Sequence, residues 1–211
     1  MRARSHVRTG HVTLALLAAL ACSDLAHVNP YDPAAPFAID VAGPALVQVG
    51  DTVTFTAETT PAWTWSPPPE WSSLDSRILL PLGGGRYVAV GGGTTTVQVR
   101  FGPHGETQDI AVQSEAPTIT GLSPHRVHSD TGSVVVTLTG TGFNQRTAIT
   151  WNGGARLTEY VDRTRLLVAL SAADIAVIGS HALVAINAAP GGGMSQAVFL
   201  LSVRRSPASA P

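Results

Sequence analysis

Alternation of apolar and polar residues with a period of two is the feature that most limits how this chain can fold. In "DTVTFTAET" the apolar positions are Val53, Phe55 and Ala57, and threonines or acids stand between and beside them. Because successive side chains of a β-strand point to opposite faces, such a stretch can bury one face and expose the other. Three further stretches alternate in the same way, with Val97, Val99 and Phe101, with Val134, Val136 and Leu138, and with Ala197, Phe199, Leu201 and Val203.

Glycine and proline clusters separate these stretches at short intervals. Three consecutive glycines occur at 83–85, 91–93 and 191–193, and three prolines at 67–69. Many short strands joined by regular turns are typical of a β-sandwich. We predict hairpin turns at the glycine runs, because none leads into a helix carrying the lysine of a phosphate-binding loop.

The alternating part of the chain divides near "QSEAPTITGLSP". We therefore predict an all-β chain with two tandem β-sandwich domains, residues 37–115 and 116–203, and a disordered tail over 204–211. Without disulfides, each domain must rely on a well-filled core. The one helical candidate is "SAADIA" at 171–176, a turn or two at most, with Ser171 as its cap.

The N-terminus reads as a targeting segment. Arg2, Arg4 and Arg8 precede an almost wholly apolar stretch over 12–21, with no acid nearby. Ten residues are too few for a helix that crosses a bilayer, which needs roughly 20. The pattern predicts a secretory signal peptide over residues 1–21.

Cys22, the only cysteine of the chain, follows directly after "ALA". This arrangement resembles the lipobox of bacterial lipoproteins, although Ala19 stands where leucine is usual. The resemblance implies that Cys22 is lipidated and becomes the mature N-terminus, followed by a proline-rich tether over 22–36. Ser23, in place of aspartate, implies sorting to the outer membrane. Each buried methylene contributes about 0.8 kcal/mol, so two or three acyl chains would hold the protein to the cell envelope. The alternative is ordinary secretion with a free thiol.

Charge argues against nucleic acid as a partner. The whole chain has a formal charge of -1, and all 13 basic residues are arginine. Loss of residues 1–21 removes three arginines and no acid, which leaves 10 arginines and 14 acids, a formal charge of -4. Proteins that bind polyanions normally carry a basic excess. A single cysteine also excludes an internal disulfide and cysteine-rich zinc sites.

The second predicted domain contains "APTITGLSP", "VVVTLTGTGFNQRTAITWNGG", "TRLLVALSAADIA" and "INAAPGGGMSQAVFLLSV". In order and spacing these stretches resemble an IPT/TIG domain. The resemblance implies an immunoglobulin-like sandwich over nearly all of 116–203. The turn at 140–143 would be a tight connection permitted by its glycines, and Phe143 would close the end of the sandwich.

The first predicted domain contains "VQVGDTVTFTAET" and "GRYVAVGGGTTTVQVRFG". These stretches resemble the early strands and the late turn of a bacterial immunoglobulin-like domain of the BIG2 type. The stretch between them, "TTPAWTWSPPPEWSSLDS", is longer and richer in proline than that family implies. Which tryptophan takes the core position of the family stays open.

Trp63, Trp65 and Trp71 are the candidate ligand-binding residues. Three tryptophans within nine residues could form a stacking surface for sugar rings or for the prolines of a partner. The alternative places Trp63 and Trp65, two apart on a strand, in the core, and Trp71 as the exposed one. Because sandwiches of this kind usually bury a tryptophan, we favour the second interpretation.

No other cluster in the sequence predicts chemistry. His125, His128 and Asp130 could bind zinc, but a fourth ligand is missing and we expect exposed loop residues. "GMSQA" at 193–197 departs from the G-x-S-x-G elbow of serine hydrolases. We therefore predict no enzyme, no metal and no cofactor.

Taken together, these features predict a lipid-anchored cell-envelope protein that binds a protein or polysaccharide partner or acts as a spacer. The alternative is an accessory subunit of a secreted carbohydrate-active enzyme or of an export machine. A hydrolase with an unrecognised site is the third hypothesis, and no convergent site supports it.

Overall fold

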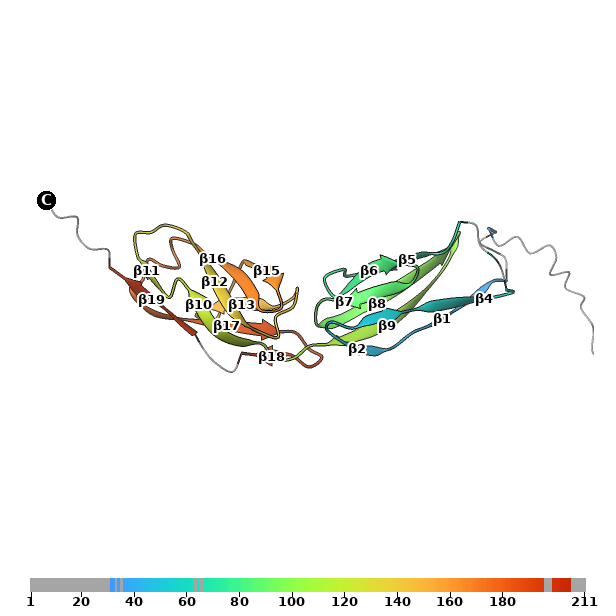
Figure 1. Cartoon of the computed structure of the whole chain (residues 1–211). Helices are drawn as coiled ribbons and strands as arrows, with labels where there is room; N and C mark the ends of the chain where they lie inside the picture. The colour runs from blue at the N-terminus through green and yellow to red at the C-terminus, as the bar shows by residue number, and fades with distance from the viewer. Residues whose placement is uncertain are drawn as a thin grey trace, which may run out of the picture.

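The computed structural model describes residues 31, 32, 34, 36–62, 64, 67–195 and 199–205. This part of the chain is all-β and contains no helix, so no helix in it could cross a membrane. Two β-sandwiches lie end to end along one axis (Figure 1). The first described strand begins near one pole of the molecule, and the last ends at the opposite pole.

The first sandwich is made of three sheets. Strands β2, β9, β8 and β5 form a four-stranded sheet, β3, β7 and β6 a three-stranded sheet, and β1 and β4 a pair. Their bounds are β1 Ala38–Ala42, β2 Leu46–Gln48, β3 Thr52–Thr54, β4 Thr56–Thr60, β5 Glu70–Ser73, β6 Leu79–Gly83, β7 Arg86–Ala89, β8 Gly93–Phe101 and β9 His104–Gln113.

The core of the first sandwich is aliphatic and aromatic. Tyr87 is fully buried at its centre, with its ring edge-on to Phe55 at 5.8 Å. The Tyr87 hydroxyl donates a 3.1 Å hydrogen bond to the Ser72 carbonyl, so this buried polar atom has a partner. The remaining fully or nearly buried members are Val47, Val53, Ile78, Leu79, Ala89, Val97, Ile110 and Val112.

The second sandwich is made of two sheets. One has the order β10-β12-β16-β15, and the other β11-β19-β17-β13-β14, with β18 paired to β17. Their bounds are β10 Thr118–Ser123, β11 Arg126–His128, β12 Val134–Thr141, β13 Ala148–Trp151, β14 Gly154–Arg156, β15 Thr158–Asp162, β16 Arg165–Leu170, β17 Gly179–Asn187, β18 Gly193–Met194 and β19 Phe199–Arg204.

A separate core fills the second sandwich. Its large members include Phe143, which is fully buried, and Trp151, which stacks on His181 at 4.7 Å. Gly142 has a φ of 72°, a value that favours glycine, and this turn directs Phe143 into the core. A side chain at Gly140 would lie 2.0 Å from the Thr118 carbonyl oxygen, so only glycine fits there.

The alternating faces predicted from the sequence are confirmed wherever the structure describes them. Val97, Val99 and Phe101 are buried on one face of β8, and Leu201 and Val203 on one face of β19. Ala197 lies outside the described residues. The stretch with Val53 and Phe55 differs in one respect. The strand breaks at Phe55, so β3 pairs with β7 and β4 pairs with β1.

One local prediction is confirmed and one needs correction. "SAADIA" forms a single hydrogen-bonded turn, within the turn or two expected, and the Ser171 hydroxyl accepts a 3.3 Å hydrogen bond from the Asp174 N–H, as expected of a cap. The Asp174 carboxylate in turn accepts hydrogen bonds from the backbone and hydroxyl of Ser171. The glycine runs at 83–85 and 191–193 lie in hairpins, as predicted. The run at 91–93 does not. It connects β7 to β8, which belong to different sheets, and it lies against the second sandwich.

Candidate binding site at the junction of the two sandwiches

The residues that the sequence singled out fall in different places. Cys22, Trp63 and Trp65 lie outside the described residues. Trp71 lies in β5, where it is half-buried and packs against the core of the first sandwich. Trp71 is therefore only partly exposed, because its place in the strand turns the ring partly inward. The expectation that it is the more exposed of the three tryptophans stays a prediction, since Trp63 and Trp65 are outside the described residues.

One face of Trp71 still borders an open groove. The groove has a volume of about 470 Å³ and is also lined by Phe55, Phe101, Pro68 and Pro69. Apolar rings and prolines at one surface are suited to stacking on a flat apolar ligand face. Of the two tryptophans that the structure describes, Trp71 is half-buried and Trp151, in the second sandwich, is buried.

His125, His128 and Asp130 do not converge. His128 lies in the short strand β11, rather than in a loop, and its Nδ1 lies 3.2 Å from the Arg205 carbonyl oxygen. Across the described parts of the chain, no three histidine, cysteine, aspartate or glutamate side chains are placed to hold a metal ion.

The junction between the two sandwiches is the place where residues from distant parts of the sequence come closest together. Two glycine runs far apart in the sequence meet on the segment Ser114–Pro117, which connects β9 to β10. A side chain at Gly92 would lie 2.4 Å from Ser114 Oγ, and one at Gly191 would lie 2.3 Å from the Ser114 carbonyl oxygen. The backbones approach this closely only because both positions lack a Cβ.

Ser114 is nearly buried and uses all its polar groups on the second sandwich. Its backbone N–H donates to the Pro190 carbonyl at 3.1 Å, and its carbonyl accepts from the Gly192 N–H at 2.6 Å. Its hydroxyl donates to the Ala188 carbonyl at 3.0 Å. The connecting segment is therefore tied to the loop between β17 and β18, and it is not a free linker.

Asn187 secures the other side of this segment. Its Nδ2 donates to the carbonyls of Glu115 and Gly142, both at 2.7 Å. Its Oδ1 accepts from the Thr147 hydroxyl at 2.6 Å. Since the Asn187 side chain is only 3% exposed, leaving its partners unsatisfied is costly.

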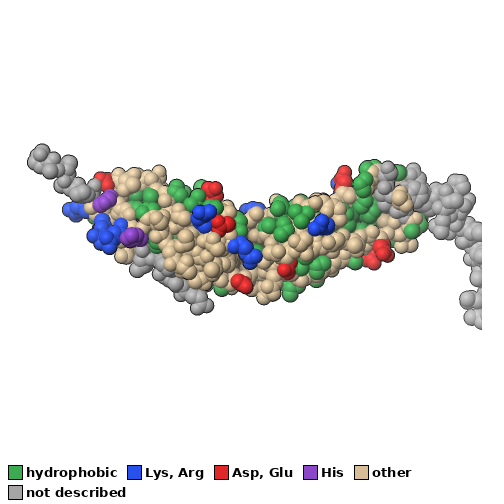
Figure 2. Space-filling view, viewed as in Figure 1, with side chains coloured by type: hydrophobic (Ala, Val, Ile, Leu, Met, Phe, Trp, Pro, Cys, Tyr) green, Lys and Arg blue, Asp and Glu red, His purple; other side chains and the backbone are tan. Residues whose placement is uncertain are grey.

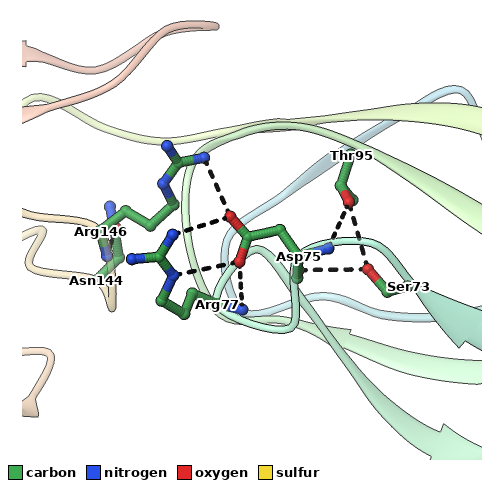
Figure 3. Close-up of polar contacts among 6 residues, drawn as sticks. All are labelled: Ser73, Asp75, Arg77, Thr95, Asn144 and Arg146. Atoms are coloured by element: carbon green, nitrogen blue, oxygen red, sulfur yellow. Dashed lines mark hydrogen bonds and ion pairs between the residues drawn. The ribbon is translucent and has the colours of Figure 1, made fainter.

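An ion pair also joins side chains of the two sandwiches (Figure 3). Asp75, in the loop between β5 and β6, accepts hydrogen bonds from the backbone and guanidinium of Arg77. Arg146 of the second sandwich reaches the same carboxylate, with 3.8 Å between Nη1 and Oδ2. Burial alone would raise the pKa of Asp75, but the hydrogen bonds from Arg77 and the charges of both arginines lower it below its usual value.

One backbone hydrogen bond also joins the two sandwiches, next to the contact between Asp75 and Arg146. The Gln145 N–H donates to the Val90 carbonyl at 3.1 Å. The Arg146 side chain then lies against the glycines at 91 and 93, where a Cβ would lie within 3.0 Å of it. Charged side chains of both signs gather at this waist of the molecule (Figure 2).

A cleft of about 280 Å³ lies beside this contact. Gln48 and Gln113 line it from the first sandwich, Asn144 and Arg163 from the second, and Glu115 from the connecting segment. Most of its walls are polar, so it can accept hydrogen-bonding and charged groups.

Sequence reasoning missed this junction. Its residues do not form a motif, because they come from stretches of both sandwiches that lie far apart in the sequence. The available signal was weak: two glycine runs and an isolated serine at the break between the alternating regions.

Comparison with known proteins identifies no relative. No protein-family model matches the sequence, and no curated protein matches it. The resemblances to the BIG2 and IPT/TIG families therefore stay predictions.

Solved structures with some likeness include domains 4 and 5 of the S-layer protein SbsC, with 11% identity over 79% of this chain and 97% of that one, at a TM-score of 0.31. The extracellular region of plexin A4 has 13% identity over 78% of this chain and 18% of that one, with a TM-score of 0.36. An auxiliary nutrient binding protein from Bacteroides ovatus has 16% identity over 43% of this chain and 21% of that one, with a TM-score of 0.31. The match spans about a fifth of that protein. At these values no function transfers to this chain.

Proposed function

We propose that this chain is a lipid-anchored protein of the cell envelope that presents two coupled β-sandwiches to a protein or polysaccharide partner and has no catalytic activity of its own. The anchor is Cys22, and the outer membrane is the proposed location. The single observation that carries the presenting role is the tied junction, in which Ser114 uses its backbone and hydroxyl on the second sandwich.

A coupled pair of sandwiches has a mechanical consequence. With a free linker, the second sandwich would sample many directions and bind a distant partner at an entropic cost. With the junction bonded on several sides, the pair extends as one body from the described N-terminal pole to the opposite pole (Figure 1). Such a body suits the presentation of loops at a fixed distance from a membrane.

The anchor is tested by mass spectrometry of the mature N-terminus, together with fractionation of cells that express the chain. The proposal expects a protein that begins at an acylated Cys22 and is recovered with the envelope. The variant Cys22→Ser should leave the envelope fraction, whereas Ser23→Ala, a matched change one residue away, should stay. Recovery of the protein from the cytosol with residues 1–22 intact would refute the proposal.

The binding role is tested separately with a glycan array and with affinity capture from envelope extracts, using the full chain in mild detergent. Saturable capture of one glycan class or one envelope protein supports the binding role. Absence of any ligand, in a protein shown to be acylated, would reduce the proposal to a spacer.

A further inference from the structure

The cleft between the sandwiches has the position and size of a small-ligand site. Ligand pockets are frequent at the boundaries between domains, and most have volumes of about 300–1,000 Å³. The volume of about 280 Å³ lies just below that range, so an occupant must be small. Because both sandwiches contribute walls, an occupant would contact both.

Arg163 supplies a positive charge to this cleft. It lies in the turn between β15 and β16, and its Nη1 lies 2.6 Å from where a Cβ on Gly50 would stand. The guanidinium of the second sandwich therefore lies against the first. Within the described residues, its guanidinium forms no ion pair and no hydrogen bond. Arg163 is an exposed residue, so its guanidinium stands at the rim of the cleft and remains open to solvent. A guanidinium without an ion pair is suited to a carboxylate, which it can hold with two parallel hydrogen bonds.

Asn144 lines the cleft and carries a buried donor without a partner in the described part of the chain. The side chain is 2% exposed, and its Oδ1 accepts a 2.8 Å hydrogen bond from the Arg146 N–H, which fixes the orientation of the amide. Its buried Nδ2 has no hydrogen-bond partner among the described residues. Buried amide donors are almost always satisfied in native proteins, so this orphan sets the site apart from an ordinary interior. The nitrogen itself is almost inaccessible, so an occupant of the cleft would be held by the charged side chains and not by this donor.

Glu115 supplies the opposite charge. Its side chain is exposed, it lines the same cleft, and it forms no ion pair with Arg163 or with any other described side chain. A lone cation would attract any anion, but a carboxylate on the same rim repels dianions and attracts an ammonium group. The cleft thus offers a donor, Arg163, for the carboxylate end of a small zwitterion and an acceptor, Glu115, for its ammonium end.

We propose that the junction cleft binds a small zwitterion of the α-amino acid class, with its carboxylate on Arg163 and its ammonium group toward Glu115. The site is separate from the lipid anchor, and it gives the proposed binding role a second ligand class. Because an occupant touches both sandwiches, its binding would also stiffen the junction.

The experiment titrates the full chain, ¹⁵N-labelled and in mild detergent, with L-alanine, propionate and ethylamine. Propionate lacks the ammonium group of L-alanine, and ethylamine lacks the carboxylate. The proposal expects saturable shifts of the Val49, Gln113 and Phe143 amides with L-alanine, at least about tenfold weaker binding of propionate, and no saturation with ethylamine. Equal binding of propionate and L-alanine would overturn the zwitterion assignment.

Two charge variants locate the site. Arg163→Gln should abolish the L-alanine shifts, and Glu115→Gln should bring the affinity for L-alanine down to that for propionate. Arg165→Gln is the matched control, because Arg165 pairs with Asp162 on the surface and does not line the cleft. Unchanged L-alanine binding in a folded Arg163→Gln variant, or no saturation in the wild-type chain, would overturn the proposal. Neither result would affect the acylation test at Cys22.

Discussion

The hydroxyl of Ser114 donates a 3.0 Å hydrogen bond to the carbonyl of Ala188, across the boundary between the two sandwiches. Ser114 follows directly after the last strand of the first sandwich, and Ala188 begins the loop after β17 in the second. The polar groups of Ser114 are therefore hydrogen-bonded to the second sandwich, as polar groups inside a domain usually are.

The contact between Asp75 and Arg146 should govern orientation more than stability. Both side chains are partly exposed, and such pairs contribute about 0–1 kcal/mol to the free energy of unfolding. We expect Arg146→Gln to leave the melting temperature nearly unchanged but to broaden the distance distribution between spin labels placed on the two sandwiches. Arg165→Gln, which removes a pair within one sandwich, should leave that distribution as it is.

Acid should weaken the same contact. The pKa of Asp75 is lowered in the folded chain, so its ionised form adds stability above its unfolded value of about 3.8. This contribution is lost as the pH falls from that value through the lower folded pKa. Titration of Asp75 by carboxyl-carbon NMR should therefore give a pKa below that of a model aspartate. In Arg77→Gln the pKa should rise, and a pKa unchanged by that substitution would contradict the assignment.

Gly92→Ala should force the sandwiches apart at one point. The added methyl would lie 2.4 Å from Ser114 Oγ and 2.7 Å from Ser114 Cβ, and overpacking of this kind costs about 1–3 kcal/mol when the structure cannot yield. Hydrogen exchange should then quicken at the Ser114 and Gly192 amides, whose bonds cross the junction. Gly84→Ala is the comparison, since no atom lies within 4 Å of its added methyl and only its positive φ is strained. It should leave those two amides protected.

Asn187→Ala should be the most damaging single change at the junction. It removes two donors to backbone carbonyls and the acceptor of the Thr147 hydroxyl, and each group left unsatisfied costs about 1–3 kcal/mol. Chemical denaturation should show a lower free energy of unfolding for the second sandwich. Asn187→Asp keeps the acceptor but places a carboxylate against two carbonyl oxygens, so it should not restore stability. Rescue by aspartate would show that the donors matter little.

Tyr87 should titrate well above the usual pKa of a tyrosine, which is about 10. Burial raises its pKa to about 12, which means that its neutral form is favoured in the folded chain. Its contribution to stability is complete below pH 10, the unfolded value, and declines as the pH rises from there toward 12. Absorbance at alkaline pH should show a late ionisation that disappears in Tyr87→Phe. That variant should also lose about 0.5–1.5 kcal/mol, because it deletes the hydrogen bond to Ser72.

The sequence predicted the fold well where one face of a strand is buried. Alternation around Val97 or Leu138 depends only on the period of a strand, so the buried faces followed directly. The break at Phe55, where one stretch changes sheets, could not be seen, because the period continues unbroken through it.

The candidate site was much less predictable. The tryptophan-rich stretch attracted attention by its composition, yet Trp71 is half-buried against the core. The junction depends instead on approaches between stretches far apart in the sequence, such as Ser114 and Ala188, which are 74 positions apart. Those approaches follow from how two finished sandwiches meet, and no local pattern encodes them.

The placement of the two described ends at opposite poles gives this molecule a measurable length. A donor dye near Ala38 and an acceptor near Arg204 would report every change in the angle at the waist as a change in energy transfer. The same geometry means that a load pulling on both ends would pass through the backbone of residues 114–117, and the hydrogen bonds of Ser114 and Asn187 would resist the bending of that segment.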